Sequence, residues 1–445
     1  MDRNVMSYPQ AMFDRCAATV EHMTGGEERA VDALIPDIIG DIALIFVVAS
    51  LLGALARKCG QPVVIGQILT GVILGPSLLG RLPGHLTSHL FPSHALPYLN
   101  VLSQVAVVIF MFAVGYEIEF GTLRRQGRVV PLVALGALFV PMGLGMACGL
   151  LLRPEFTSIG ITDEGRSFVL FMGAATSITA LPVLASIVRD RNLAGTTAGV
   201  IATAAAGIMD VLAWLVLAAA LIGTGHSGPF SLPVTALLLA CFVVVMLVAV
   251  RPAVSWWTNR RESVLFSPVP VALALAMTSA WITASLGLHP IFGAFLAGLT
   301  MRGTKRAPEA DVVRAMDLAG SMLLPLFFVV TGLSLNIGEV RGDAFLLLVV
   351  ILVIAVAGKL GPGYGISRVC RLSSRDSGTI AALVNTRGLT ELIALNVALT
   401  DGIINQRLFT VLVLMALITT LATGPLLSAI KPSRALQPAE DQYVT

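Results

Sequence analysis

Charged residues are scarce in this chain of 445 residues, of which 12% are charged and 56% are hydrophobic. Soluble domains carry about 25% charged residues, so the composition excludes a soluble enzyme and a nucleic-acid-binding protein. Two blocks, residues 211–250 and 263–301, contain no Asp, Glu, Lys or Arg at all. Each block is long enough for two helices of about 20 residues. The sequence therefore predicts an all-α integral membrane protein that is embedded in the lipid bilayer.

Cysteine is also rare, and motifs for covalent chemistry are missing. The five cysteines are scattered without CxxC or metal-ligand spacing, which argues against a disulfide framework and against a zinc site. The sequence contains no Gly-rich phosphate loop, no HExxH and no Ser/His/Asp grouping. We therefore expect no enzymatic reaction, no cofactor, no nucleic-acid partner and no resident metal.

Charged and Gly/Pro-rich junctions divide the chain into a polar tail over residues 1–37, a membrane domain over 38–430 and a short tail over 431–445. The membrane domain contains thirteen apolar spans, at about 38–56, 62–79, 100–118, 129–152, 167–188, 195–222, 231–250, 267–287, 289–301, 317–335, 343–367, 377–399 and 408–430.

Lys and Arg are distributed unequally between the alternating loops. Seventeen fall in the loops on one side, whereas the loops on the other side hold five: Arg81, Arg153, Arg166, Arg341 and Arg407. Cytoplasmic loops of membrane proteins carry the excess of Lys and Arg. The distribution predicts a multi-pass protein of the cell membrane with its N-terminus outside and its C-terminus in the cytoplasm.

Short motifs recur along the chain and indicate an internal repeat. They fall into three pairs: residues 66–71 with 293–298, 110–115 with 327–332, and the polar interruptions 176–179 with 385–391. All three pairs join a span to the seventh span after it, and an odd offset inverts the second copy. Transporters are often built from such inverted repeats. The pattern predicts six spans, one linker span and six inverted spans.

Asp210 is the sharpest feature because its span, residues 195–222, contains no other charge. At 1.5 Å per helical residue it lies at least about 18 Å from either end, near the bilayer midplane. A charge there costs at least about 2.5 kcal/mol and marks a functional site by default. The alternative is a structural role, in which Asp210 caps a helix or pairs statically with a base.

Lys359 is the second charge inside the membrane. It lies about 12 Å of helix from the inward end of its span, so its stem could snorkel to the interface, or it could pair with Asp210. Arg387 and Glu391 are i, i+4 neighbours that can neutralise one another, and Asn385 precedes them in the same interrupted span. We predict that these residues are the charge partners of the site.

The interrupted span at 167–188 supplies oxygen ligands. Pro182 cannot donate to the carbonyl of Ile178, which leaves a free oxygen beside Thr176, Ser177 and Thr179. Hard oxygens suit an alkali cation, although small polar residues also serve ordinary helix packing in membranes. His289 could sense pH, but we favour a satisfied interfacial histidine.

Four runs of sequence resemble the monovalent cation/proton antiporter superfamily, in the branch with Kef-type and plant CHX-type exchangers. The resemblance covers roughly residues 38–430, and the runs occur in the family's order: 61–69 continuing to 75–77, 293–298, 325–328 and 385–392. It implies the Na⁺/H⁺ antiporter-like fold of about thirteen helices, with a dimerisation domain and a core in which two broken helices cross. The resemblance also implies a homodimer. It also implies alternating access by an elevator-like movement.

The resemblance carries over to individual residues. Asp210 matches the carboxylate for which cation and proton compete, and Lys359 matches the family's basic residue in the membrane. Met209 departs from the pattern, because relatives carry Asp, Asn or Gln before the carboxylate.

We therefore expect a secondary active antiporter that exchanges Na⁺ or K⁺ for H⁺. If Lys359 loses a proton during the cycle, transport is electrogenic, and if it stays charged, one-for-one exchange is electroneutral. Two alternatives stay open. The first is a channel-like or sensory protein of the same fold, which the apolar Met209 in place of a polar residue would fit. The second is a proton-coupled exporter of an organic solute, which would need a wide apolar cavity.

Overall fold

The computed structural model describes residues 34–83, 86–117, 128–161, 165–222, 232–259, 268–286, 288–302 and 310–430. Regular structure within these ranges is entirely helical. The first helix begins at Leu34, a few residues before the expected start at 38, and ends at Lys58. The rest of the expected N-terminal tail and all of the C-terminal tail lie outside the described residues.

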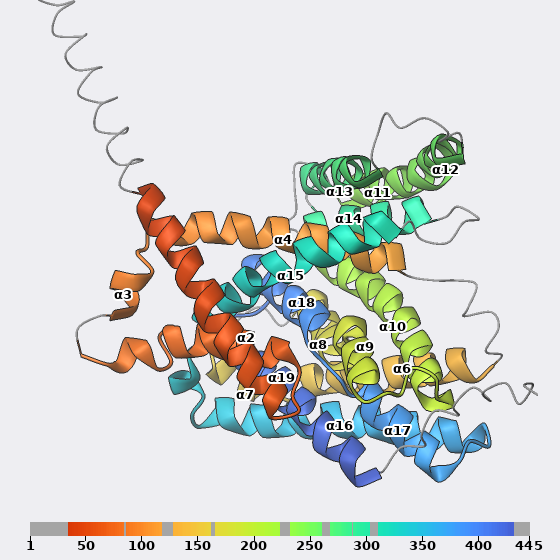
Figure 1. Ribbon diagram of the computed structural model, residues 1–445. Coiled ribbons are helices and arrows are strands. Elements are labelled where there is room, and N and C mark those ends of the chain that lie inside the picture. Colours follow the sequence, from red (N-terminus) through yellow and green to blue (C-terminus); the bar gives the residue numbers. More distant parts are fainter. Residues whose placement is uncertain are drawn as a thin grey trace, which may run out of the picture.

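The helices after this first one follow the expected spans closely (Figure 1). In chain order they are α2 (Val63–Leu74), η1 (Leu79–Arg81), α3 (Leu86–Leu90), α4 (Leu96–Glu117), α6 (Val129–Leu151), α7 (Arg153–Ser158), α8 (Arg166–Ser177), α9 (Leu181–Asp190), α10 (Thr197–Ile222), α11 (Leu232–Val245), η2 (Met246–Val250), α12 (Arg251–Asn259), α13 (Pro268–Ser285), α14 (Pro290–Arg302), α15 (Ala310–Leu333), η3 (Ile337–Glu339), α16 (Asp343–Val369), α17 (Ser374–Val384), α18 (Leu389–Thr400) and α19 (Gln406–Ile430).

Eleven helical segments among the described residues are long and apolar enough to cross a membrane. Two expected spans are missing from that set for a physical reason. The α14 helix is apolar but short, and the span at 377–399 is divided into α17 and α18. With these two included, the described helices account for the thirteen expected spans.

The helices pack in two groups (Figure 1). We call the first the panel; it contains the helix Leu34–Lys58, α2, α4, α13, α14 and α15, with α4 packed on α14 and α15, and α2 on α15. We call the second the core bundle; it contains α6, α8, α9, α10, α16, α17, α18 and α19, with α6 packed on α8 and α16. The first three spans of each predicted repeat thus meet in the panel, and the broken spans meet in the core bundle.

Glycine contacts in the panel follow the inverted repeat. A Cβ atom on Gly71 of α2 would lie 2.6 Å from the Cα of Gly332 in α15. The equivalent glycines of the other repeat are similarly close. A Cβ on Gly298 of α14 would lie 3.0 Å from the carbonyl carbon of Gly115 in α4. Gly71 corresponds to Gly298, and Gly115 to Gly332, in the paired motifs of the sequence. The same backbone contact therefore occurs twice, as the predicted repeat requires.

Candidate functional site

Two helices of the core bundle are broken, and their extended linkers cross. The chain leaves α8 at Ser177 and enters α9 at Leu181, with Ile178 and Ala180 in extended conformations. It leaves α17 at Val384 and enters α18 at Leu389. The backbone N–H of Ala180 donates to the carbonyl of Thr386 over 3.1 Å and ties the two linkers together.

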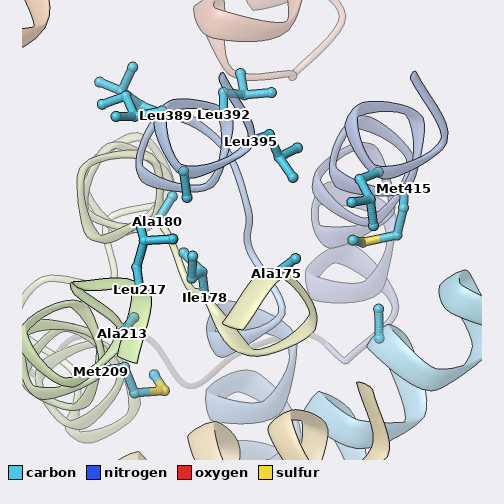
Figure 2. Packing of buried hydrophobic residues seen from close by; sticks show 14 of the residues in the cluster. Ala175, Ile178, Ala180, Met209, Ala213, Leu217, Leu389, Leu392, Leu395 and Met415 are labelled. Carbon is cyan, nitrogen blue, oxygen red and sulfur yellow. The ribbon is translucent and has the colours of Figure 1, made fainter. Parts of the chain in front are cut away.

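Gly388 allows the second linker to turn into α18. Its φ of 154° lies in the region that favours glycine, and a Cβ there would lie 2.7 Å from Cγ2 of Val183. In Figure 2 the linker with Ile178 and Ala180 lies between α10, which carries Met209, and α18, which begins with Leu389. The two interrupted spans are therefore broken and crossed, as expected.

Two basic side chains cap the carboxyl end of α8. Arg387 donates from Nη1 to the carbonyl of Ala175 over 2.7 Å and from Nη2 to the carbonyl of Thr176 over 2.5 Å. Lys359 Nζ donates to the next carbonyl, that of Ser177. The last carbonyls of a helix lack partners inside it and carry partial negative charge. Bases from the second repeat thus neutralise the helix end that the break exposes inside the protein.

Lys359 is fully buried and is bound to the first linker. Besides the Ser177 carbonyl, its Nζ donates to Oγ1 of Thr179 over 2.5 Å and lies 3.9 Å from Sδ of Met209. It forms no ion pair with Asp210, and it does not snorkel to an interface. Acceptors at the helix break take up the ammonium hydrogens, and Lys359 attracts Asp210 electrostatically without an ion pair between them.

Asp210 lies near the middle of α10 with its side chain only 1% exposed. Within the described part of the chain, neither carboxylate oxygen has a hydrogen bond of normal geometry. The backbone N–H of Leu181 at the start of α9 and the ammonium group of Lys359 both attract the carboxylate. The amino end of a helix carries partial positive charge. Asp210 is therefore held in a favourable field but has no fixed partner.

The predicted oxygen ligands are in the first linker, but they are not equally available. Thr179 Oγ1 donates to the Val384 carbonyl over 2.9 Å and accepts from Lys359, so it is occupied. The hydroxyls of Thr176 and Ser177 donate to the carbonyls of Pro141 and Ala174, over 2.9 and 3.0 Å, and keep free lone pairs. No described group donates to the Ile178 carbonyl. Of these oxygens, those of Asp210 and of the Ile178 carbonyl accept no hydrogen bond of normal geometry among the described residues.

The second linker supplies a separate polar cluster. Arg387 and Glu391 form a fully buried ion pair with Nη1 and Oε1 2.8 Å apart. Asn385 Nδ2 donates to the Thr419 carbonyl over 3.4 Å, whereas its Oδ1 has no partner among the described residues. Arg387 therefore connects α8, the second linker and α18 through its hydrogen bonds and its ion pair. The structure does not bring this cluster into contact with Asp210.

Trp214 is a residue that the sequence analysis did not single out. It follows Asp210 by four positions on α10, and its side chain is 5% exposed. Its Nε1 has no hydrogen-bond partner among the described residues. The i, i+4 spacing from the carboxylate was the signal that could have found it. Among the described residues no group of three or more His, Cys, Asp or Glu could hold a metal ion.

Comparison with known proteins assigns the family. Residues 44–430 match the family described as sodium/hydrogen exchanger, transmembrane. The chain belongs to the sodium/hydrogen exchanger family. The thioether of Met209, the residue before Asp210, lies 3.9 Å from Nζ of Lys359 and 3.8 Å from Oγ1 of Thr179.

Several relatives of this exchanger-family chain have been named. The Na(+)/H(+) antiporter NhaS4 of Synechocystis sp. is 34% identical over 407 residues, which are 89% of this chain and 98% of that protein. Cation/H(+) antiporter 19 of Arabidopsis thaliana is 34% identical over 425 residues, 94% of this chain and 52% of its own length. K(+)/H(+) antiporter 1 of Saccharomyces cerevisiae is 30% identical, over 87% of this chain and 46% of that protein. The chain thus spans about half the length of the plant and yeast relatives.

The fold also matches a solved structure. The sodium proton antiporter MjNhaP1 from Methanocaldococcus jannaschii aligns with a TM-score of 0.64 over 89% of this chain and 97% of that one. The sequence identity is 15%, so this match supports the antiporter fold and carries no information on individual residues.

Proposed function

We propose that this protein exchanges a monovalent cation, Na⁺ or K⁺, for H⁺ across a membrane, and that both compete for Asp210. The observation that carries the proposal is the buried carboxylate near the middle of α10, beside two broken helices, with no ion pair and no hydrogen bond of normal geometry among the described residues. An ionised carboxylate at that depth costs at least about 2.5 kcal/mol. A proton or a bound cation removes that cost. Relatives named as Na⁺/H⁺ and K⁺/H⁺ antiporters support the same substrates.

The competition follows from the oxygens around the first linker. At low pH Asp210 is protonated. At higher pH it is ionised and binds a partly dehydrated cation, to which the Ile178 carbonyl and the hydroxyls of Thr176 and Ser177 contribute oxygens. Hard oxygens are the ligands that alkali cations prefer. Either occupant neutralises the site.

Neutralisation couples the two transported ions. The core bundle carries Asp210, whereas the panel is a separate group of helices. Moving a charged, empty site past the apolar panel is costly, and moving a neutral site costs less. The core bundle therefore changes sides mainly when a proton or a cation is bound, which suppresses leak.

The test is transport by the purified full chain in proteoliposomes with a pH-sensitive dye inside. Na⁺, K⁺ or Li⁺ is added in turn outside wild-type protein and Asp210→Asn. We expect cation-driven proton movement in wild type and loss of at least about 100-fold in Asp210→Asn, since one buried group carries both ions. Proton movement that persists in Asp210→Asn would disprove the site. No movement in wild type with any of the cations would favour the sensory or solute-exporter alternatives.

We further propose that the N-terminus lies outside, that the C-terminus is cytoplasmic and that the protein is a homodimer. The charge distribution of the loops supports the orientation. Large apolar side chains on the helix Leu34–Lys58, including Val47, Leu51 and Leu55, are exposed and support contact with lipid or with a second copy. Single-cysteine labelling tests the orientation, because an impermeant maleimide should not reach the exposed Cys59 in intact cells. Mass measurement of the detergent-solubilised protein tests the dimer.

A further inference from the structure

Trp214 lies on α10 between Asp210 and the Ile222 end of the helix, and its indole nitrogen has no hydrogen-bond partner among the described residues. Trp214 shares a helix face with the carboxylate because four residues separate them. Its indole N–H is buried and has no acceptor among the described residues. A buried donor without a partner costs about 1–3 kcal/mol unless water or a ligand satisfies it. We therefore expect the indole N–H of Trp214, one helical turn from Asp210, to donate to a water molecule or a ligand.

A second unpaired ring nitrogen belongs to the panel. His289 immediately precedes α14, and its Nδ1 is buried without a partner among the described residues. Its carbonyl accepts the backbone N–H of Phe292 over 3.2 Å. The Phe292 ring in turn meets Trp214 edge-on, with centroids 5.9 Å apart and an interplanar angle of 89°. His289 therefore lies close to the place where the panel meets Trp214 of α10.

The proposed topology places Trp214 and His289 on the same side of Asp210. Asp210 is near the middle of α10, and Trp214 is one turn closer to its Ile222 end. His289 is at the opposite end of α14 from Arg302. In the proposed orientation both positions are on the outward side of Asp210. Buried polar groups that lack protein partners are commonly bridged by water, and a chain of water between such groups conducts protons.

We propose that His289 relays protons between Asp210 and the outward side, and that Trp214 orients the water between them. This inference rests on the proposed exchange activity. In the relay, the O–H bond of Asp210 breaks, the proton passes over water, and an N–H bond forms at His289 Nδ1. The imidazolium then loses its Nε2 proton outward, and proton exchange with water restores the first tautomer. No electron is transferred.

The surroundings of His289 keep its imidazole neutral between transfers, as a proton acceptor must be. Burial lowers the pKa of His289 to about 4, below the usual value of imidazole. On α10 the only titratable residue is Asp210, α13 has none, and α14 has only Arg302 at its far end. The helices packed against α14 add four more: Tyr98, Tyr116 and Glu117 on α4, and Arg251 on α12. His289 forms no hydrogen bond or ion pair with any of these residues within the described structure.

The test compares His289→Gln with wild type in the proteoliposome assay across a range of pH. Gln fills the site and forms hydrogen bonds but does not relay a proton. We expect the maximal exchange rate to fall at least about 10-fold, the KM for the cation to stay nearly unchanged, and the pH dependence to change shape. His94→Gln is the matched control, because His94 is exposed and pairs with Asp37 over 3.1 Å away from the site.

Two further variants separate a relay from a structural role. Trp214→Phe keeps the ring against Phe292 and removes only the N–H, and it should give a smaller loss with the same change in pH dependence. His289→Ala should regain exchange when imidazole is added, which a structural defect would not. Wild-type rates and pH dependence in both His289→Gln and Trp214→Phe would overturn the relay and leave the exchange function intact. Absence of exchange in wild type would overturn both.

Discussion

At the scale of single residues, the buried side chains of Lys359 and Arg387 donate hydrogen bonds mainly to the carboxyl end of α8. Ala175, Thr176 and Ser177 present three successive carbonyls, and Arg387 and Lys359 cover all of them. Asp210 by contrast has no fixed partner. Two positive charges thus stabilise the break in α8, and the one carboxylate stays available. This division of roles separates the residues that build the site from the residue that binds the transported ions.

Lys359→Met tests the capping role. Methionine matches the length of the side chain but donates no hydrogen bond, so the Ser177 carbonyl and the Thr179 hydroxyl lose a charged donor. We expect a loss of about 3 kcal/mol in stability, since hydrogen bonds to charged groups contribute about 1.5–3 kcal/mol each. Thermal unfolding in detergent measures it, with Lys58→Met on the exposed inward end as the control. Equal melting temperatures for the two variants would contradict the capping role.

At the scale of helices, glycine contacts fix the spacing of the panel. The α2–α15 and α4–α14 pairs approach so closely that backbone of one helix fills the place of a side chain on the other. Small residues permit such contacts in membranes, where packing rather than the hydrophobic effect drives helix association. The repeated contact gives the panel a rigid frame against which the core bundle can move.

Gly332→Ala and Gly115→Ala test the contacts. A Cβ on Gly332 would lie 2.7 Å from the Cα of Gly71, and one on Gly115 would lie 2.2 Å from the Phe295 carbonyl oxygen. Because neither neighbour is a flexible side chain, we expect each variant to lose about 2 kcal/mol. Gly143→Ala in α6 is the matched control, since nothing lies within 4 Å of its Cβ, and alanine improves helix propensity by up to about 1 kcal/mol. Melting temperatures of the purified variants decide the comparison.

At the scale of the whole molecule, panel and core bundle share one apolar core, and a few polar contacts also join them. Asn396 of α18 donates to Thr331 of α15 over 3.0 Å, and Gln406 at the start of α19 donates to the Ser334 carbonyl. Arg407 and Glu339 lie 3.8 Å apart nearby. These contacts lie toward the end of α15 that faces outward in the proposed orientation. A sliding movement of the core bundle must break them.

A disulfide across this boundary tests the movement. In a background without native cysteines, Thr331→Cys combined with Asn396→Cys should stop exchange when oxidised and restore it when reduced, because the bond locks core bundle to panel. Each single variant is the control and should exchange under both conditions. The proteoliposome assay with and without reductant measures the effect. Unchanged exchange in the fully cross-linked double variant would contradict a moving core bundle.

The sequence by itself determined the parts of this protein that hydropathy and charge control. The spans were predicted to within a few residues, because lipid selects apolar helices of fixed length. The repeat, the two breaks and the isolated Asp210 were also predicted, since glycine, proline and buried charge have strong local meaning in a membrane.

Only the tertiary structure decided which groups meet. Lys359 was expected beside Asp210, but it binds the Ser177 carbonyl, 182 positions away in sequence. The ring of Phe292 in α14 meets Trp214 of α10 edge-on, although 78 positions separate them in sequence. Both outcomes depend on distances between segments far apart in the chain. Composition and spacing carry no information about such distances, and helix packing sets them.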